Sequence, residues 1–118
     1  MTEAEIKQII EEEITVDANG DDEVYMGWYY FMSETLEFPF RAETTIKKRN
    51  GKTEECTVDV VEDATNPNRF KCQAYYVNID YKDVLMKVEV ADLQPVNASD
   101  DTLKAITVWK YWLAKGYY

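Results

Sequence analysis

The sequence predicts an α+β fold, because helical and strand-like patterns occupy separate parts of the chain. Apolar residues recur at helical spacing before residue 39 and again after residue 98, and between them the pattern alternates with a period of two. We therefore expect one domain over residues 1–118, with a helical acidic region (1–38), a sheet region (39–97) and a C-terminal helix (98–118). A chain of 118 residues is long enough for one hydrophobic core of this kind.

Two helices are expected in the first region. Thr2 and Glu5 form the pattern of a capping box at the start of a helix over residues 2–14. The second helix is expected to begin at Asp21 or Asp22 and to end before Pro39, which disfavours a helical conformation at the preceding residue. We interpret the stripe along one side of this second helix as core packing, because large aromatic side chains dominate small cores. The stripe consists of Val24, Tyr25, Trp28, Phe31, Met32, Thr35 and Leu36.

The sheet region contains four runs rich in β-branched and aromatic residues: 40–49, 53–62, 69–79 and 83–96. Turn signals such as Asn50-Gly51 separate these runs. Four to five short antiparallel strands are therefore expected. A small curled sheet of this size is typical of an SH3-like β-barrel, which buries one face and removes most free edges.

The last helix is expected to begin with Ser99 or Asp100 as its cap and to end at Gly116. Its apolar stripe is broad enough to dock on the barrel or on the first two helices. The stripe consists of Ala105, Ile106, Trp109, Trp112 and Leu113.

The charge balance limits the partners. The chain has 23 acidic and 13 basic residues and a net charge of −10, which argues against nucleic acid and favours cations or a basic protein. Neither a signal peptide nor a run of about eighteen apolar residues occurs, so we expect a cytoplasmic monomer without a membrane partner. Cys56 and Cys72 show no CxxC spacing and are expected to remain free thiols.

Histidine is absent, which removes imidazole bases and most types of zinc site. Any metal is therefore expected to be a hard cation, Ca²⁺ or Mg²⁺, held by carboxylate, amide and carbonyl oxygens. An enzyme is not expected. The carboxylate pair Glu34 and Glu37 lies one turn apart on an exposed helix, without the opposed placement and the burial that glycoside hydrolysis requires.

The segment DANGDDEVYMGW, residues 17–28, begins like the calcium loop of an EF-hand. Loop positions 1, 3 and 5 carry oxygen side chains, but position 6 is Asp22 instead of glycine and position 12 is Trp28 instead of glutamate. The turn is therefore interpreted either as a helix cap alone or as a cap that also forms an open cation site outside an EF-hand. Its candidate ligands are Asp17, Asn19, Asp21, Asp22 and Glu23. The competing role is N-capping of the second helix by Asp21 or Asp22.

A second acidic cluster is expected at the other end of the same helix. Glu34 and Glu37 lie one turn apart there, and the distance from Glu23 to Glu34 is about 16 Å along the helix, too far to share one ion. Two acids are too few for Ca²⁺, so Asp100 and Asp101 are expected to complete one of the two clusters if the last helix packs across the second. A solvated helix face would also explain each acidic run.

Two segments resemble a known family. Residues 13–42 and the C-terminal segment VWKYWLAKGYY resemble the CcbP-type calcium-binding proteins of cyanobacteria, in which an acidic turn runs into MGWYYY and then FPF. The matching residues are Met26, Gly27, Trp28, Tyr29, Tyr30, Phe31 in the last tyrosine position, Phe38, Pro39 and Phe40. The resemblance implies a small soluble protein that buffers or senses intracellular Ca²⁺ through acidic groups outside an EF-hand. It does not identify the ligands.

The leading hypothesis is thus a non-enzymatic calcium buffer or sensor. The alternative is an SH3-like interaction module whose acidic face docks a basic partner. In that alternative, exposed tyrosines would anchor the partner: Tyr29, Tyr30, Tyr75 and Tyr76.

Overall fold

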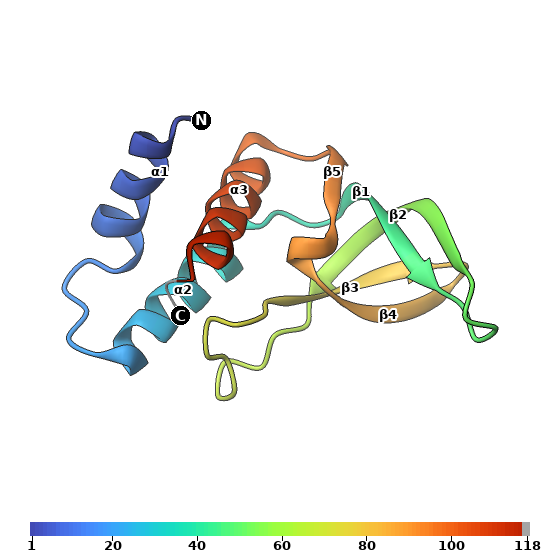
Figure 1. Cartoon of the computed structure of the whole chain (residues 1–118), viewed down its shortest axis with the longest axis horizontal. Helices are drawn as coiled ribbons and strands as arrows, with labels where there is room; N and C mark the ends of the chain where they lie inside the picture. Colours follow the sequence, from blue (N-terminus) through green and yellow to red (C-terminus); the bar gives the residue numbers. More distant parts are fainter. Residues whose placement is uncertain (117–118) are drawn as a thin grey trace.

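The computed structural model describes residues 1–116 and confirms the α+β fold. The helices gather at one end of the molecule and the strands at the other (Figure 1). The elements in chain order are α1 (Glu3–Ile9), η1 (Ile10–Ile14), α2 (Asp21–Thr35), β1 (Phe40–Lys47), β2 (Thr53–Asp63), β3 (Tyr76–Tyr81), β4 (Val84–Glu89), η2 (Val90–Asp92), β5 (Gln94–Asn97) and α3 (Asp100–Lys115). The last two residues of the expected C-terminal helix lie outside the described residues. None of the described helices is long and apolar enough to cross a membrane.

The N-terminal helix differs from the expected continuous α-helix. The capping box is confirmed, because the Thr2 hydroxyl accepts a hydrogen bond from the Glu5 amide at 3.2 Å. After Ile9, however, the chain widens into the π-helical turn η1, which the Thr15 amide closes by donating to the Ile10 carbonyl at 2.8 Å. Ile10 and Ile14 are both buried at the two ends of this turn.

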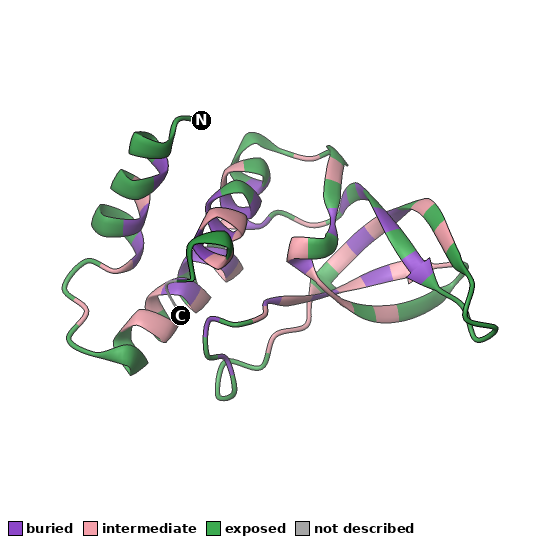
Figure 2. Ribbon diagram, viewed as in Figure 1, coloured by how far each residue is buried: buried purple, intermediate pink, exposed green. Residues whose placement is uncertain are grey.

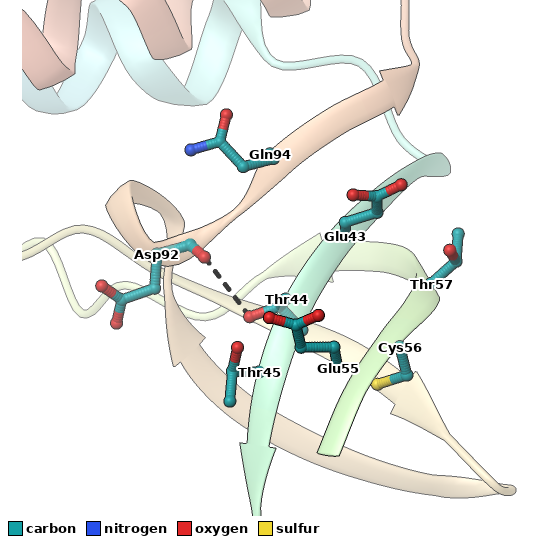
Figure 3. Close-up of a pocket in the computed structure, with 8 residues that line it drawn as sticks. All are labelled: Glu43, Thr44, Thr45, Glu55, Cys56, Thr57, Asp92 and Gln94. Carbon is teal, nitrogen blue, oxygen red and sulfur yellow. Dashed lines mark hydrogen bonds between the residues drawn. The ribbon is translucent and has the colours of Figure 1, made fainter. Parts of the chain in front are cut away.

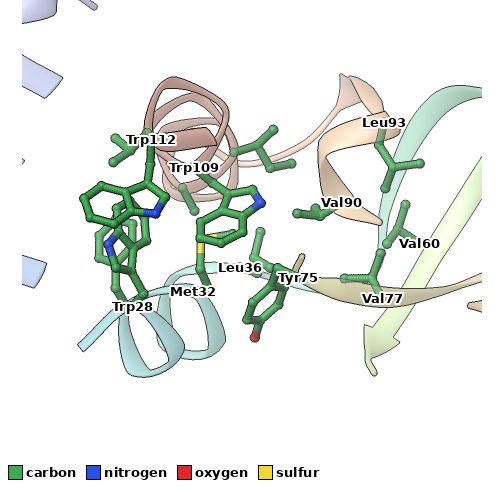
Figure 4. Packing of buried hydrophobic residues seen from close by; sticks show 14 of the residues in the cluster. Trp28, Met32, Leu36, Val60, Tyr75, Val77, Val90, Leu93, Trp109 and Trp112 are labelled. Atoms are coloured by element: carbon green, nitrogen blue, oxygen red, sulfur yellow. The ribbon is translucent and has the colours of Figure 1, made fainter. Parts of the chain in front are cut away.

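Helices α2 and α3 pack against each other through tryptophans (Figure 4). The ring centroid of Trp28 lies 5.2 Å from that of Trp109 and 5.0 Å from that of Trp112. The core stripe predicted for α2 is confirmed at Trp28, Phe31, Met32 and Leu36, which are all buried. Buried residues occur where α2 and α3 meet, and exposed residues follow the outer side of α1 (Figure 2).

The two ends of α3 lie where the sequence predicted them. The Ser99 hydroxyl accepts a hydrogen bond from the Thr102 amide at 3.1 Å, and Gly116 adopts a left-handed conformation with φ = 69°. The helix is fixed to the segment that directly follows α2, because the Thr102 hydroxyl also accepts a hydrogen bond from the Glu37 amide at 2.8 Å. The start of α3 is thereby placed beside the last turn of α2.

The strands form one antiparallel sheet in the order β4-β3-β2-β1-β5. The register of β1 with β2 runs from Phe40 opposite Val60 to Lys47 opposite Thr53, and alternate residues of β1 are buried. Within the described chain, β4 and β5 are the two edges of the sheet and do not pair with each other. The sheet is therefore not closed, and the predicted SH3-like barrel is not confirmed.

Two of the predicted strand runs differ from the structure. The run over residues 69–79 is strand only from Tyr76 onward, because Phe70, Cys72 and Tyr75 turn into the core and Cys72 has a positive φ of 59°. The run over residues 83–96 is divided by η2 into β4 and β5, and this division produces the fifth strand. The segment 64–75 is consequently a loop that contributes aromatic side chains to the helical end of the core.

Candidate metal centre

The acidic turn between η1 and α2 has an unexpected cap. Gly20, with φ = 141°, occupies the N-cap position of α2, and no side chain makes a capping hydrogen bond there within the described chain. The prediction that Asp21 or Asp22 caps the helix is therefore wrong, because both residues lie inside its first turn. The Glu23 carboxylate instead accepts a short hydrogen bond from the Asn19 amide, which closes the turn.

Three of the predicted acids gather at one hollow, which we call the turn hollow. Its volume is about 350 Å³. Asp17, Asp22 and Glu23 line it together with the exposed apolar residues Val16 and Met26. Asp17 reaches this position through a left-handed backbone conformation with φ = 58°. The other two predicted ligands, Asn19 and Asp21, belong to the same turn but do not line the hollow.

A second hollow, the helix hollow, lies between α2, α3 and η1 and has a volume of about 460 Å³. Glu34 of α2 and Asp101 of α3 both line it, so packing of α3 across α2 brings these predicted residues to one place. Glu13 also lines it and was not among the predicted ligands, since residues 11–13 would point in three directions on a regular helix. The amino group of Lys104 lies 3.2 Å from a Glu13 carboxylate oxygen, so this hollow already contains one positive charge.

The remaining predicted residues of the second cluster lie elsewhere. Glu37 and Asp100 are exposed and line neither hollow. The backbone of Glu37 is occupied in holding Thr102, as described above. Of the four residues predicted for the second cluster, Glu34 and Asp101 therefore line one hollow, whereas Glu37 and Asp100 do not.

Gly27 lies between the two hollows and lines both. A Cβ atom at this position would lie only 2.2 Å from the carbonyl oxygen of Ile14. The π-helical turn η1 thus packs directly on the backbone of α2, and no side chain fits between them. Glu13 lines the helix hollow and Asp17 lines the turn hollow, and Gly27 is common to both.

A third acidic hollow lies on the sheet (Figure 3) and has a volume of about 420 Å³. Glu43 of β1, Glu55 of β2 and Asp92 of η2 line it, and the buried Thr44 hydroxyl donates to the Asp92 carbonyl at 3.3 Å. Sequence reasoning did not single out these acids, because Asp92 comes near Glu43 and Glu55 only through the pairing of β5 with the distant strand β1.

The donor chemistry of the turn and helix hollows fits a hard cation. The acidic side chains offer only oxygen, and the chain contains no histidine. Across residues 1–116, however, no group of three or more such side chains lies close enough together to hold a metal ion. The carboxylates therefore surround each hollow at a distance and would have to converge to share one ion.

The tyrosines proposed as anchors for a basic partner are not all accessible. Tyr75 is fully buried, and the Tyr75 hydroxyl donates a short hydrogen bond to Asp63. Burial and this hydrogen bond raise the pKa of Tyr75 far above its ordinary value. Tyr30 is exposed, whereas Tyr29 and Tyr76 are half-buried. The prediction of an exposed Tyr75 is therefore wrong.

An α+β fold with an open antiparallel sheet and, within the described residues, surface hollows whose acidic side chains offer only oxygen donors defines a class of small acidic protein with donors suited to hard cations. Comparison of the sequence with known protein families then identifies the family. A family model described as calcium binding, of the CcbP type, matches residues 8–113, and the chain belongs to this family. The resemblance seen in the sequence is thus confirmed.

Two solved structures are similar to this chain over nearly its whole length. One is described as the crystal structure of Anabaena CcbP: it is 36% identical, with a TM-score of 0.82, and the match covers 98% of this chain and 94% of that one. The other is described as a calcium binding protein in the calcium-binding form: it is also 36% identical, with a TM-score of 0.76, and the match covers 100% of this chain and 99% of that one. No curated protein sequence matches this chain.

Proposed function

We propose that this protein binds Ca²⁺ through surface carboxylates outside an EF-hand and acts as an intracellular calcium buffer or sensor. The observation that carries the proposal is the acidic turn, where Asp17, Asp22 and Glu23 line one hollow and none of them caps α2. Membership of a calcium-binding family supports the choice of ion, as does a relative of 36% identity described in a calcium-binding form.

The turn hollow is the proposed principal site. Its three carboxylates are the proposed anchoring ligands, and Asn19 and Asp21 stand in the same turn as additional oxygen donors. Ca²⁺ takes six to eight oxygens, so backbone carbonyls and water would complete the coordination. The positive end of the α2 dipole opposes a cation here, and the cluster of acids must outweigh it.

The helix hollow is the proposed weaker site. Glu34 and Asp101 are its proposed ligands, with Glu13 as a third carboxylate. Lys104 already neutralises part of this charge, so an incoming cation must displace or tolerate the ammonium group. Glu37 and Asp100 would contribute to the negative potential without contacting the ion.

The mechanism follows from charge. The ion-free chain has a net charge of −10, and the acids around each hollow repel one another. A bound Ca²⁺ relieves this repulsion and stabilises the folded state by mass action, by about 2.7 kcal/mol when free Ca²⁺ is 100 times the dissociation constant. Since η1, α2 and α3 all contribute acids, binding would also tighten the contacts among these three elements.

Calorimetric titration and thermal melting with Ca²⁺ and with Mg²⁺ test the proposal. The wild type should release or absorb heat with Ca²⁺ and melt several degrees higher, whereas the double variant Asp17→Asn with Asp22→Asn should bind at least about tenfold more weakly. Asparagine tolerates the left-handed conformation of Asp17, so this variant keeps the backbone of the turn.

The matched control removes two exposed acids outside the hollows, by Glu11→Gln with Glu62→Gln. This control has the same net charge as the Asp17→Asn, Asp22→Asn variant and should retain the wild-type affinity for Ca²⁺. Equal weakening in both variants would show that only the overall charge attracts the ion, and absence of heat in the wild type would refute calcium binding. A change in the near-UV circular dichroism spectrum on Ca²⁺ binding would favour a sensor, because it would show a conformational change. An unchanged spectrum would favour a buffer.

A further inference from the structure

We propose that a basic hollow beside β3 binds a small ligand through its phosphate group. The hollow has a volume of about 240 Å³ and lies between the loop 64–75 and the strands β3 and β4. Arg69 and Lys71 of the loop and Lys87 of β4 line it, together with Asn66, Gln73 and Tyr76. This site is separate from the acidic hollows and does not depend on calcium binding.

The charge of this hollow is opposite to that of the chain. The protein has 23 acidic residues against 13 basic ones, yet no acid lines the hollow and three of the basic residues do. Elsewhere in the described chain, basic residues such as Arg41, Lys48 and Lys104 form ion pairs with carboxylates. Within residues 1–116, no carboxylate forms an ion pair with any of the three cations of the hollow.

Two of these cations are held over aromatic rings. The Lys87 ammonium lies 4.4 Å from the ring centroid of Tyr76, and the Lys71 ammonium lies 5.3 Å from that of Tyr25. Such contacts restrict a long side chain and leave its N–H donors available to an anion. The basic side chains are therefore partly ordered before a ligand arrives, which lowers the entropic cost of binding.

The loop that carries Arg69 and Lys71 is fixed at both ends. The Ala64 amide donates to the Tyr76 carbonyl at 3.0 Å, and the Tyr76 amide donates to the Thr65 hydroxyl at 2.7 Å. Between the two basic residues, the buried Phe70 packs against the core, with its ring centroid 5.8 Å from that of Trp109. Phe70 thus anchors the rim of the hollow to the helices, and its two neighbours stay at the surface.

The chemistry of the lining favours phosphate. A guanidinium group matches two phosphate oxygens in a fork geometry, and two ammonium groups bind phosphate as point charges. Three positive charges suit a dianion such as a phosphate monoester better than a single carboxylate. A nucleic acid polymer is not the expected ligand, because the net charge of −10 repels a long polyanion. A small ligand depends mainly on short-range contacts within the hollow, which this long-range repulsion weakens much less.

Amide chemical-shift titration of the calcium-free protein tests the proposal, with inorganic phosphate and adenosine monophosphate as separate probes at constant ionic strength. Saturable shifts are expected, confined to residues 64–76 and to the neighbourhood of Lys87. Tighter binding of adenosine monophosphate would indicate a phosphate ester as the ligand, and equal binding would indicate free phosphate.

Two charge-matched variants locate the site. Arg69→Gln with Lys87→Gln should weaken phosphate binding at least about tenfold, since two of the three charged hydrogen-bond donors are lost from the hollow and only Lys71 remains. Arg49→Gln with Lys52→Gln removes the same charges from an exposed turn and should bind like the wild type. Shifts in the wild type that do not saturate, or that sodium chloride reproduces, would overturn the proposal. Chemical shifts that persist unchanged in the Arg69→Gln, Lys87→Gln variant would also overturn the proposal.

Discussion

Substitution of Gly27 by alanine tests the contact between η1 and α2 directly. The new Cβ atom would lie 2.2 Å from the Ile14 carbonyl oxygen, whereas carbon and oxygen atoms in contact are ordinarily about 3.3 Å apart. The two elements must therefore separate by about 1 Å. Because the obstacle is a backbone atom, η1 has to move as a unit, and Ile10 and Ile14 lose part of their burial.

Two effects oppose each other in this variant. Alanine favours the helix over glycine by about 1 kcal/mol. Overpacking of a filled contact costs about 1–3 kcal/mol, and partial exposure of two isoleucines, each worth about 1.5–3 kcal/mol when buried, adds to that cost. The cost of overpacking and lost burial is larger than the gain in helix propensity. We therefore expect a net destabilisation of about 2 kcal/mol and a melting temperature lower by roughly 6–12 °C.

Urea denaturation and thermal melting of the ion-free protein measure this difference, with Ser33→Ala on the same helix as the control. The control should stay within about 0.5 kcal/mol of the wild type, because Ser33 contributes only a hydroxyl bonded to the Tyr30 carbonyl of its own helix. A Gly27→Ala variant as stable as the wild type would refute the close packing of η1 on α2.

Two further predictions concern the junction of α2 with α3 and the cysteines. Thr102→Val leaves the Glu37 amide without its acceptor, so the free energy of unfolding in urea should fall by about 1–3 kcal/mol, whereas the exposed Thr107→Val should have little effect. Burial raises the pKa of the Cys72 thiol to about 12, so thiol counting with Ellman's reagent in the native state should find only Cys56 reactive at pH 8. This raised pKa stabilises the fold below the thiol's ordinary pKa of 9.0, and the contribution should be lost as the pH rises from there towards about 12.

The helix ends were predictable from sequence because caps are local. Thr2 and Ser99 bond to amides three residues away, and Gly116 supplies the left-handed conformation at its own position. The start of α2 was predicted correctly, but its cap was not: the preference of aspartate for N-cap positions suggested Asp21 or Asp22, and the preceding Gly20 takes that place. A local rule therefore located the start of the helix but misassigned its N-cap residue.

The features that depend on distant contacts were not predictable. The alternating run over residues 69–79 was interpreted as a strand, because sequence does not show that Cys72 adopts a positive φ or that Phe70 is buried in the core. The meeting of Glu34 with Asp101 required the packing of α3 on α2, and Glu13 joins them only because η1 contacts Gly27. The edge strands β4 and β5 follow each other in the chain, but β5 crosses the sheet to pair with the distant strand β1, so the sheet stays open, and the register of each hairpin alone does not decide this.

The tryptophan cluster has an optical consequence. The indole rings of Trp28, Trp109 and Trp112 are buried in one group, and buried indoles emit at shorter wavelengths than indoles in water. Trp28 lies on α2 midway between Asp22 and Glu34, so a change in the tilt of this helix alters the ring geometry within the group. The intrinsic fluorescence of the unlabelled protein would therefore report any movement of α2 that ion binding causes.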